Sequence, residues 1–416
     1  MDQATQLDIL KHLINIKTVA DNEAEVALYL QQLLKDHGIK SQVIEQFPGR
    51  SNLVAEIGDG NGPKLAFSGH EDTVHQGNDA DWQTPPFEAT VKDNNVYGRG
   101  ATDMKSGLAA QVIALIELAD SKTPIHGTLR FLATISEELT QGGANYLSQK
   151  GYVDDLDAVI LGEPTGVPIA DTKRYFNSGG NYTSAEVSEQ LASVDSRYHN
   201  QHFIVNAHKG AFIYTVESFG KAAHSSTPNL GISAIDNLFE YRMAEKNLFA
   251  NFIEKDPELG GTIYTPDIFR GGQQVNSIPD YAYQKVMVRT IPQLSNDTIK
   301  EALQDLVDQF NQRKGFNLKL TVTFSGNPVK SDATSKVIKI ARSKASADLD
   351  EPLALPLIQI SMGTDGSQYQ HRNPNLDLIV LGPGNNTAHQ ANEFVDLDSY
   401  YRFIRLYQDI AKEYLQ

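Results

Sequence analysis

Hydrophobic residues recur at helical spacing near the start of the chain, which predicts amphipathic helices over about 5–16 and 23–37. Short and almost wholly apolar runs follow, each bounded by turn residues, and they are typical of buried strands. One longer run, apolar nearly all round, predicts a helix packed on a sheet. The strands are expected at 64–70, 128–138, 157–164 and 376–384, and the helix at 106–119. This alternation indicates an α/β fold with a mostly parallel sheet that is covered on both faces.

The middle of the chain has a different pattern. Residues 210–220 and 280–292 alternate apolar with polar positions, as strands of an antiparallel sheet with one wet face do. Two amphipathic helices are expected beside them, near 231–253 and 296–313. This region is therefore predicted to be a separate α+β domain.

Together these patterns predict two domains. The α/β domain is expected to comprise 1–207 and 327–416, and the smaller α+β domain to be inserted at 208–326. A polar segment at about 168–205 precedes the insertion, and we expect it to be a surface excursion.

The composition narrows the classes of function. The 416 residues include no Cys, which excludes a disulfide scaffold, a cysteine nucleophile and a thiolate metal site. A formal net charge of −16 argues against nucleic-acid binding, which needs a surface rich in Lys and Arg. No apolar run approaches the roughly 20 residues that span a bilayer, and the N-terminal segment lacks a secretory pattern. We therefore expect a cytoplasmic protein with neither a membrane nor a nucleic-acid partner.

Each predicted apolar strand ends at, or shortly before, a side chain that can bind a metal. These side chains are His70, Glu137, Glu138, Glu163 and His389, and Asp103 lies in the loop before the apolar helix. In open α/β sheets the carboxyl ends of the strands form the ligand crevice, so we expect them to converge. A set of imidazoles and carboxylates without sulfur suits zinc, cobalt or manganese. It exceeds the needs of one metal and indicates two metals bridged by an Asp.

Local spacing suggests further roles. Asp72 lies two residues after His70, so on an extended chain it would face the same way and accept the free imidazole N–H. Glu137 and Glu138 are adjacent at a strand end and would point in opposite directions, one to a metal and the other to a water as general base. The histidines expected to be ordinary solvated or capping residues are His12, His37, His126, His199, His202 and His371.

Several motifs, in a characteristic order and spacing, cover almost the whole chain: SGHEDTV, YGRGATDMKSG, ISEEL, LGEPTG, GKAAHSSTP and GPGNNTAHQANEF. They resemble those of the co-catalytic zinc amidohydrolases, the family of acetylornithine deacetylase, succinyl-diaminopimelate desuccinylase, aminoacylase and glutamate carboxypeptidase. The resemblance implies a catalytic domain with an inserted lid and dimerisation domain. It also implies two divalent metal ions, zinc first and cobalt as the alternative, and a homodimer.

The resemblance also implies a ligand set. By position in the motifs, His70 and Glu163 would bind one metal, Glu138 and His389 the other, and Asp103 would bridge them.

Catalytic roles are implied in the same way. Asp72 matches the family's histidine-supporting aspartate and Glu137 its general base. His224, in GKAAHSSTP, resembles the histidine that reaches across a dimer interface to the scissile carbonyl of the neighbouring subunit.

The motifs also narrow the substrate. Deacylases of the family mostly carry Glu at the position of Glu163, where dipeptidases and carboxypeptidases mostly carry Asp. Asn385, in NNTAHQANE, resembles the desuccinylase pattern. Further matches to desuccinylase substrate contacts are Asn276, Arg289, Gly363 and Thr364. Arg289 has a planar fork suited to a substrate carboxylate, and Lys209 is a second candidate cation.

The resemblance therefore implies a metal-dependent amide hydrolase that acts on a small acylated amino acid. The leading hypothesis is hydrolysis of N-succinyl-LL-2,6-diaminopimelate to succinate and diaminopimelate. The alternatives are acetylornithine deacetylase or another N-acyl-amino-acid deacylase, then a metallo-dipeptidase. A non-catalytic interaction protein would lack a ligand or the base, whereas every candidate position here holds a competent residue.

Overall fold

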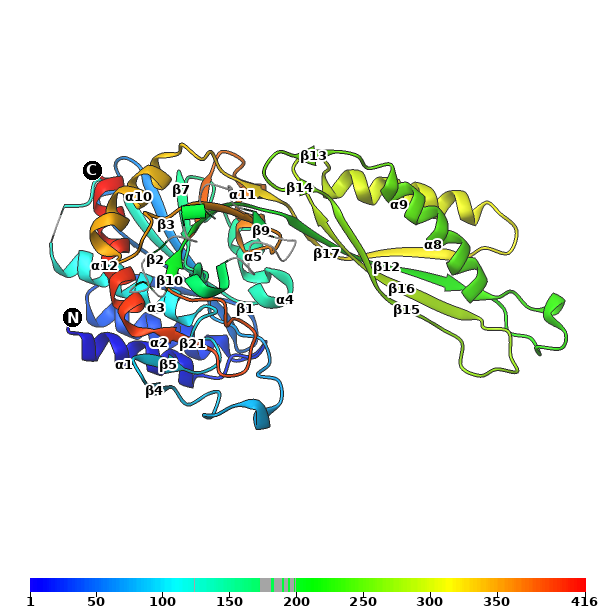
Figure 1. Ribbon diagram of the computed structural model, residues 1–416, viewed down its shortest axis with the longest axis horizontal. Coiled ribbons are helices and arrows are strands. Elements are labelled where there is room, and N and C mark those ends of the chain that lie inside the picture. Colours follow the sequence, from blue (N-terminus) through cyan, green and yellow to red (C-terminus); the bar gives the residue numbers. More distant parts are fainter. Residues whose placement is uncertain (123, 173–180, 183–188, 191–193, 195–197, 199) are drawn as a thin grey trace. The chain divides into compact units, whose positions relative to one another are not determined.

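The computed structural model describes residues 1–122, 124–172, 181–182, 189–190, 194, 198 and 200–416 (Figure 1). These residues form two compact units. The first comprises Met1–Ala207, Lys330–Ile360 and Thr364–Gln416, and the second comprises His208–Val329 and Ser361–Gly363.

The first unit is built on a sheet whose central strands are parallel. In spatial order they are β6 (Thr128–Thr134), β3 (Lys64–His70), β7 (Ala158–Leu161) and β20 (Asp377–Val380). All seven residues of β6 are buried, so both faces of the sheet are covered there. The predicted parallel α/β sheet is therefore confirmed. The outer strands are β1 (Ser41–Phe47), β2 (Arg50–Ile57), β11 (Ile204–His208), β18 (Val329–Lys330), β19 (Leu357–Ile360) and β9 (Asn181–Tyr182).

Helices cover this sheet. The apolar helix α3 (Lys105–Asp120) is buried along nearly its whole length because it contacts β3, β6, α1 and α12. Its all-round apolar pattern thus reflects contacts on several sides. Further helices of this unit are α1 (Gln3–Asn15), α2 (Glu23–Asp36), α4 (Glu137–Thr140), α5 (Gly142–Gln149), α10 (Lys336–Asp348), α11 (Gly366–Arg372) and α12 (Leu397–Tyr414).

Short elements complete the first unit. A small antiparallel sheet joins β5 (Asn95–Tyr97) to β21 (Phe394–Asp396) and so links two loops that carry candidate ligands. The remaining short elements are η1 (Asp79–Asp81), β4 (Thr90–Lys92), β8 (Gly166–Pro168) and β10 (Asn200–His202).

Two expectations need correction at the end of the polar segment. Gln201 and His202 are buried in β10, so this part of 168–205 is not a surface excursion. The His202 ring is not solvated either, because it pairs with Glu351 and its Nε2 lies 3.2 Å from the carbonyl oxygen of Pro383. Much of the segment's earlier part, with His199, lies outside the described residues.

The second unit is an antiparallel sheet covered on one face by helices (Figure 1). Its strands, in spatial order, are β15 (Ile263–Gly271), β16 (Tyr281–Thr290), β12 (Gly210–Phe219) and β17 (Leu318–Gly326). Burial alternates along β12 and β16, as their sequence pattern predicts. The helices are α8 (Ala234–Ala250) and α9 (Asn296–Asn311), and shorter elements are η2 (Pro228–Leu230), β13 (Lys255–Asp256) and β14 (Gly260–Gly261).

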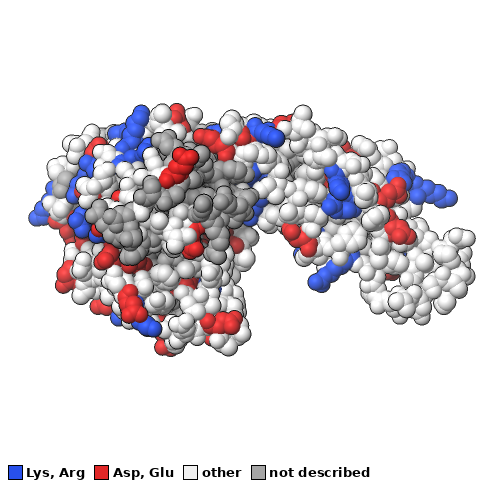
Figure 2. Space-filling view, in the orientation of Figure 1, with Lys and Arg blue, Asp and Glu red and all other residues white. Residues whose placement is uncertain are grey.

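The surface carries charges of both signs. On the face shown in Figure 2, acidic and basic side chains are interspersed over each unit. Within the described part of the chain, no helix combines the length and apolar character needed to cross a membrane.

Candidate metal centre

The predicted ligands of the first unit converge at the carboxyl ends of the parallel strands. His70 is the last residue of β3, and Glu163 follows the end of β7 by two residues. Asp103 precedes α3, Glu138 lies on α4, and His389 lies between β20 and β21. Because β3, β6 and β7 run parallel, the segments that follow them leave the sheet at one edge.

Close packing brings the Asp103 loop to this edge. Gly107, in the first turn of α3, lies against the backbone of Gly162, and a Cβ at Gly107 would lie only 1.9 Å from the Gly162 carbonyl oxygen. A side chain there would push the helix away from the strand end that carries Glu163. The small residue therefore sets the approach of Asp103 to Glu163.

Asp103 lies between two groups of side chains. Its Oδ1 is 3.1 Å from His70 Nε2, which in turn is 3.5 Å from Glu163 Oε1. Its Oδ2 is 3.3 Å from His389 Nε2, which is 3.0 Å from Glu138 Oε2. The two carboxylate oxygens thus face different imidazoles, as a bridging ligand requires.

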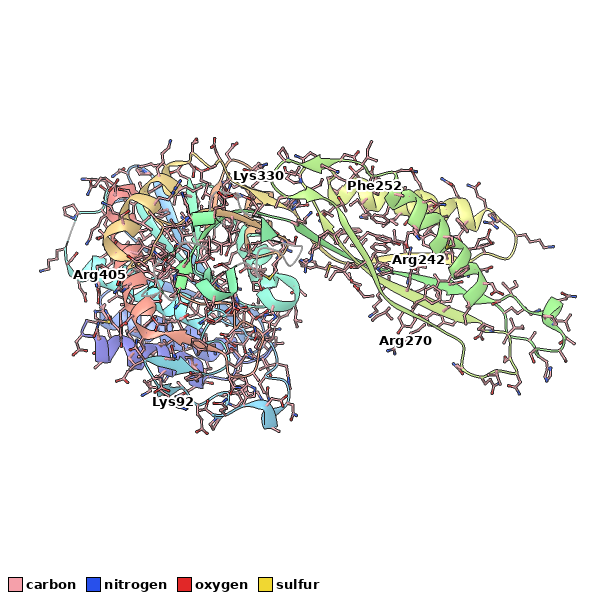
Figure 3. All side chains as sticks on the ribbon, viewed as in Figure 1. Lys92, Arg242, Phe252, Arg270, Lys330 and Arg405 are labelled. Carbon is pink, nitrogen blue, oxygen red and sulfur yellow. The ribbon has the colours of Figure 1, made fainter. Side chains whose placement is uncertain are left out.

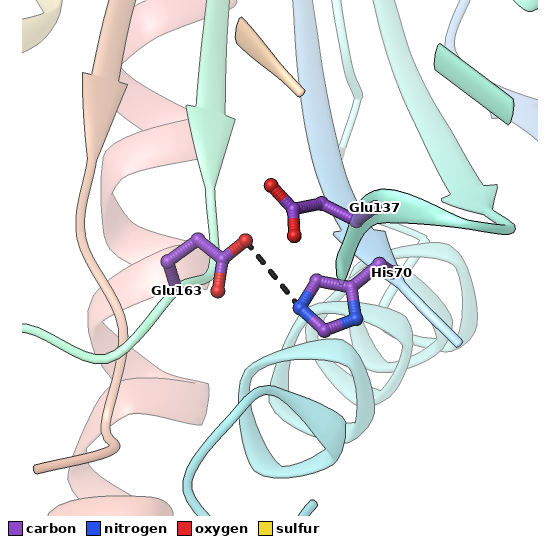
Figure 4. A group of neighbouring side chains, drawn as sticks. All are labelled: His70, Glu137 and Glu163. Atoms are coloured by element: carbon purple, nitrogen blue, oxygen red, sulfur yellow. Dashed lines mark ion pairs between the residues drawn. The ribbon is translucent and has the colours of Figure 1, made fainter. Parts of the chain in front are cut away.

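The donor set fits divalent cations. Two groups have ligand atoms within 4.8 Å of one another: His70 with Glu137 and Glu163, and His70 with Asp103 and Glu138. Figure 4 shows the first group, with the ion pair between His70 and Glu163. Glu138 Oε1 is buried and has no hydrogen-bond partner among the described residues, which suits an atom that binds a cation.

The crowded carboxylates have displaced pKa values. Burial, followed by repulsion from Asp103, raises the pKa of Glu163 to about 8. Burial and the nearby Glu163 raise the pKa of Glu137 well above its ordinary value. Both shifts show that negative charge here is costly without an added cation.

The pKa values of the imidazoles are raised as well, because the neighbouring carboxylates stabilise the protonated rings. Hydrogen bonds to Asp103 and Glu138 raise the pKa of His389 to about 10. Burial disfavours the charged form of His70, but Glu163 and Asp103 outweigh it and raise the His70 pKa well above its ordinary value. Without metal, protons on these rings offset part of the acidic charge, and a bound metal would replace them.

Asp72 holds its neighbours differently from the prediction. The closest acceptor for His70 Nδ1 is the backbone carbonyl of Asp72 at 2.9 Å, whereas its carboxylate Oδ1 is 3.7 Å away. The Asp72 carboxylate instead accepts the backbone N–H groups of Glu137 and Glu138, at 3.1 and 3.3 Å. It therefore orients both the ring and the two glutamates.

The setting of Glu137 and Glu138 corrects the expected strand. Strand β6 ends at Thr134, where its partner β3 ends at His70, and the chain turns through Ser136 with a φ of 61°. The two glutamates begin the short helix α4. They diverge because successive residues of a helix point in different directions, rather than because a strand alternates.

Three residues at this site were not predicted. Asp365 is buried beside the base candidate: its Oδ2 accepts the Thr134 hydroxyl at 2.6 Å, and its charge contributes to the raised pKa of Glu137. Arg99 and Glu393 form a buried ion pair behind Asp103. Arg99 lies in the motif YGRGATDMKSG and Glu393 in GPGNNTAHQANEF, but a single charged residue in a sequence gives no signal that it is buried.

The structure places the predicted substrate contacts in both units. Asn276, Arg289, Lys209 and His224 belong to the second unit, as does Gly363. Thr364 and Asn385 belong to the first, where the Asn385 side chain accepts from Thr387 and donates to the Phe394 carbonyl. The Asn385 amide thus shapes its own loop.

His224 and Asn276 are neighbours within the second unit. Ser225 N–H donates to the Asn276 carbonyl at 3.1 Å, and His224 forms an isolated bridge with Ser277. His224 Nδ1 accepts the Ser226 backbone N–H at 3.1 Å. A neutral His224 ring therefore carries its proton on Nε2, which leaves that nitrogen as a donor.

Two positively charged side chains, Arg289 and Lys209, lie at one end of the second unit's sheet. Arg289 on β16 pairs in register with Ala211 and Ile263. It is half-buried, which lowers its pKa, and no described residue forms an ion pair or hydrogen bond with its guanidinium. Lys209 is buried and donates to the Gly261 carbonyl, and burial lowers its pKa to about 8.

Comparison with known proteins shows the family of the chain. The sequence pattern of peptidase family M20/M25/M40 matches residues 66–413. The chain belongs to this family. A probable succinyl-diaminopimelate desuccinylase from Staphylococcus aureus (strain MRSA252) is 35% identical, over 99% of this chain and 98% of its own. The M20 chain is therefore a hydrolase that acts on amide bonds, and it has candidate metal-binding residues.

Solved structures share the fold. An M20 metallo-carboxypeptidase from Sulfolobus solfataricus has a TM-score of 0.74 at 19% identity, covering 100% of this chain and 99% of its own. A dinuclear metal-binding M20 peptidase from Bacillus subtilis has a TM-score of 0.67 at 16% identity, covering 99% and 98%.

The ligand geometry predicts the metal content of this M20 protein. Zinc-supplemented protein should carry about two metals per chain, and His389→Ala about one, because His389 lies on only one side of Asp103, beside Glu138. Elemental analysis after gel filtration measures this. The matched control is His126→Ala, which removes an exposed histidine paired with Asp59. Equal metal content in His389→Ala and the control would contradict the assignment.

Proposed function

We propose that this protein is a two-metal succinyl-diaminopimelate desuccinylase. It would hydrolyse N-succinyl-LL-2,6-diaminopimelate to succinate and LL-2,6-diaminopimelate, a step of diaminopimelate and lysine biosynthesis. The observation that carries the proposal is the position of Asp103, whose two oxygens face separate imidazoles. The chain that holds it is 35% identical to a probable desuccinylase over 99% of its residues.

The metal ligands are proposed from this geometry. His70 and Glu163 would hold one ion, Glu138 and His389 the other, and Asp103 both, with zinc as the first choice and cobalt as the second. When bound, such ions polarise an amide carbonyl and lower the pKa of water.

Glu137 is the proposed general base. Its carboxylate lies beside His70 and Glu163 and could complete a ligand group with them, but in the proposed ligand set Asp103 takes that place. It would take a proton from the attacking water and return it to the leaving amine nitrogen. Its backbone is fixed by Asp72, which accepts its N–H.

Arg289 is proposed to bind a substrate carboxylate. A half-buried guanidinium with no partner among the described residues can form two parallel hydrogen bonds to a carboxylate. The succinyl group ends in such a carboxylate, whereas an acetyl group does not. Asn276, Gly363, Thr364 and Asn385 are proposed as further contacts, and Lys209 as a supporting charge.

His224 is proposed to donate to the carbonyl oxygen of the substrate from a second copy of the chain. The support within the second unit is its Nε2, which is left as a donor because Nδ1 accepts from Ser226. A donor aimed at a developing oxyanion typically contributes about 3 to 4 kcal/mol. The protein would then act as a homodimer.

The second candidate is a peptidase or another deacylase of the same family. A structural neighbour is a metallo-carboxypeptidase, although at 19% identity it shows the fold alone. Glu163, at the position where family dipeptidases mostly carry Asp, favours the deacylase.

The base assignment predicts a separation of binding from chemistry. Glu137→Gln should bind the same two metals but lose turnover by about 10²- to 10⁴-fold, because the amide cannot accept a proton. Elemental analysis and steady-state kinetics measure the two effects. Glu56→Gln, which changes a partly exposed glutamate paired with Arg130, is the control. Turnover that survives in metal-loaded Glu137→Gln would make the assignment wrong.

A substrate panel tests the acyl group. With zinc or cobalt, kcat/KM should be highest for N-succinyl-LL-2,6-diaminopimelate, by about 10- to 100-fold over N-acetylornithine and dipeptides, because a charge-assisted contact contributes roughly 1.5–3 kcal/mol. Arg289→Met should remove most of this preference by raising KM for the succinylated substrate. Arg270→Met is the control, because Arg270 is an exposed arginine on β15 (Figure 3). A preference for the dipeptide would favour the alternative function.

Mixing two inactive variants tests the role of His224. In a dimer of Glu137→Gln with His224→Ala, one of the two sites has an intact base and receives His224 from the other chain. Subunits mixed at equal amounts should regain about a quarter of wild-type activity, since half of the dimers are mixed and each has one working site. No recovery, with mixed dimers shown by mass spectrometry, would mean that His224 does not act across an interface.

A further inference from the structure

Glu393 lies four residues after His389, in the same loop of the metal centre, and is not one of the proposed metal ligands. We propose that Glu393 is a positioning residue that fixes the bridging ligand Asp103, together with the His389 loop, before any metal binds. The inference rests on the proposed two-metal function.

The Glu393 carboxylate binds the backbone of the loop that carries Asp103. Its Oε1 accepts the N–H groups of Thr102 and Asp103, both at 2.9 Å. Its Oε2 accepts the Gly100 N–H at 3.1 Å and the guanidinium of Arg99. Four donors, from Arg99, Gly100, Thr102 and Asp103, therefore converge on one side chain.

Because the Glu393 carboxylate is buried, it depends on these hydrogen bonds. The side chains of Glu393 and Arg99 are 0% and 2% exposed, so neither charge is solvated by bulk water. A buried carboxylate is tolerated only when it is paired and hydrogen-bonded. The loop must therefore keep all four donors in place, and the position of the Asp103 backbone is fixed as a result.

The loop is wrapped tightly around the carboxylate. Gly100 has a φ of +85°, and a Cβ there would lie 2.8 Å from the Thr73 side chain. Its conformation therefore suits glycine alone, and it allows consecutive N–H groups to point inward.

The same contacts join the Asp103 loop to the His389 loop. The Thr102 hydroxyl donates to the Phe394 carbonyl at 2.7 Å and accepts the Asn385 N–H at 2.9 Å. The Gly98 N–H donates to the Glu393 carbonyl at 3.0 Å. His389, which has a φ of +65°, lies within the joined segment.

The effect on the two metals should be unequal. Asp103 and His389 lie on the joined loops, whereas His70 ends a central strand and is fixed independently of Glu393. The group of His389, Glu138 and Asp103 therefore has two of its three side chains on the loops that Glu393 holds. Loss of Glu393 should weaken this ion more than the ion at His70 and Glu163.

A titration of metal-free protein with Co²⁺ alone, followed by its visible absorption and by calorimetry, tests this. Wild type should bind two equivalents. Glu393→Gln should bind the first with an affinity within about threefold of wild type and the second about 10- to 100-fold more weakly, as for other residues that orient ligands. The reason is that the side-chain amide of the Glu393→Gln variant has only one acceptor oxygen. Its NH₂ group would face two of the four donors that the Glu393 carboxylate accepts. Glu56→Gln, on the same unit, is the matched control.

The outcomes separate two failures. If wild type binds fewer than two equivalents, the proposed function fails. If wild type binds two and Glu393→Gln has both affinities unchanged, or both weakened equally, Glu393 is only a structural residue and the inference is wrong.

A second measurement does not depend on the variant being folded. In metal-free wild type, hydrogen exchange at the amides of Thr102 and Asp103 should be as slow as in α3, because Glu393 holds both. Fast exchange at these amides would also overturn the inference.

Discussion

The crowding of negative charge at one edge of a sheet is the constraint on which the rest of the first unit depends. Asp103, Glu138 and Glu163 meet there with Glu137 close by, and their side chains are only 14%, 6% and 12% exposed, so little water screens them. Two imidazoles, His70 and His389, offset only part of this charge. Nearby residues hold these carboxylates in place. Asp72 accepts the backbone N–H groups of Glu137 and Glu138, and the contact between Gly107 and Gly162 allows α3 to lie close to the strand end that carries Glu163.

The sequence predicted that the candidate ligands lie together because their placement follows from the fold. Apolar runs on both faces require a parallel sheet, and a parallel sheet brings its carboxyl ends together. His70 and Glu163 could therefore be assigned to one crevice although they are far apart in sequence. The alternation in β12 and β16 similarly predicted a sheet with one covered face. The outer antiparallel strands were not predicted, since β1 and β2 are less apolar and less regular.

Features that depend on long-range partners were missed. Arg99 and Glu393 are separated by 294 residues, and each in isolation resembles an ordinary surface charge. His202 is buried because Glu351 lies beside it, which no local pattern reveals. The end of β6 is set by the end of its partner β3, so a continuous reading through Glu138 overran the strand. Such contacts need the tertiary structure, because the energy of a buried charge depends on its partners rather than on its neighbours in sequence.

The order of the strands has a consequence for the synthesis of the chain. Strand β20 lies between β7 and β11, yet it is made only after the whole of His208–Val329. A chain that leaves the ribosome N-terminus first can therefore complete the sheet of the second unit while the first still lacks an interior strand. His389 and Glu393 emerge later still. The acidic residues near His70 are therefore synthesised well before His389 and Glu393, and the first unit can complete its fold only near the end of translation.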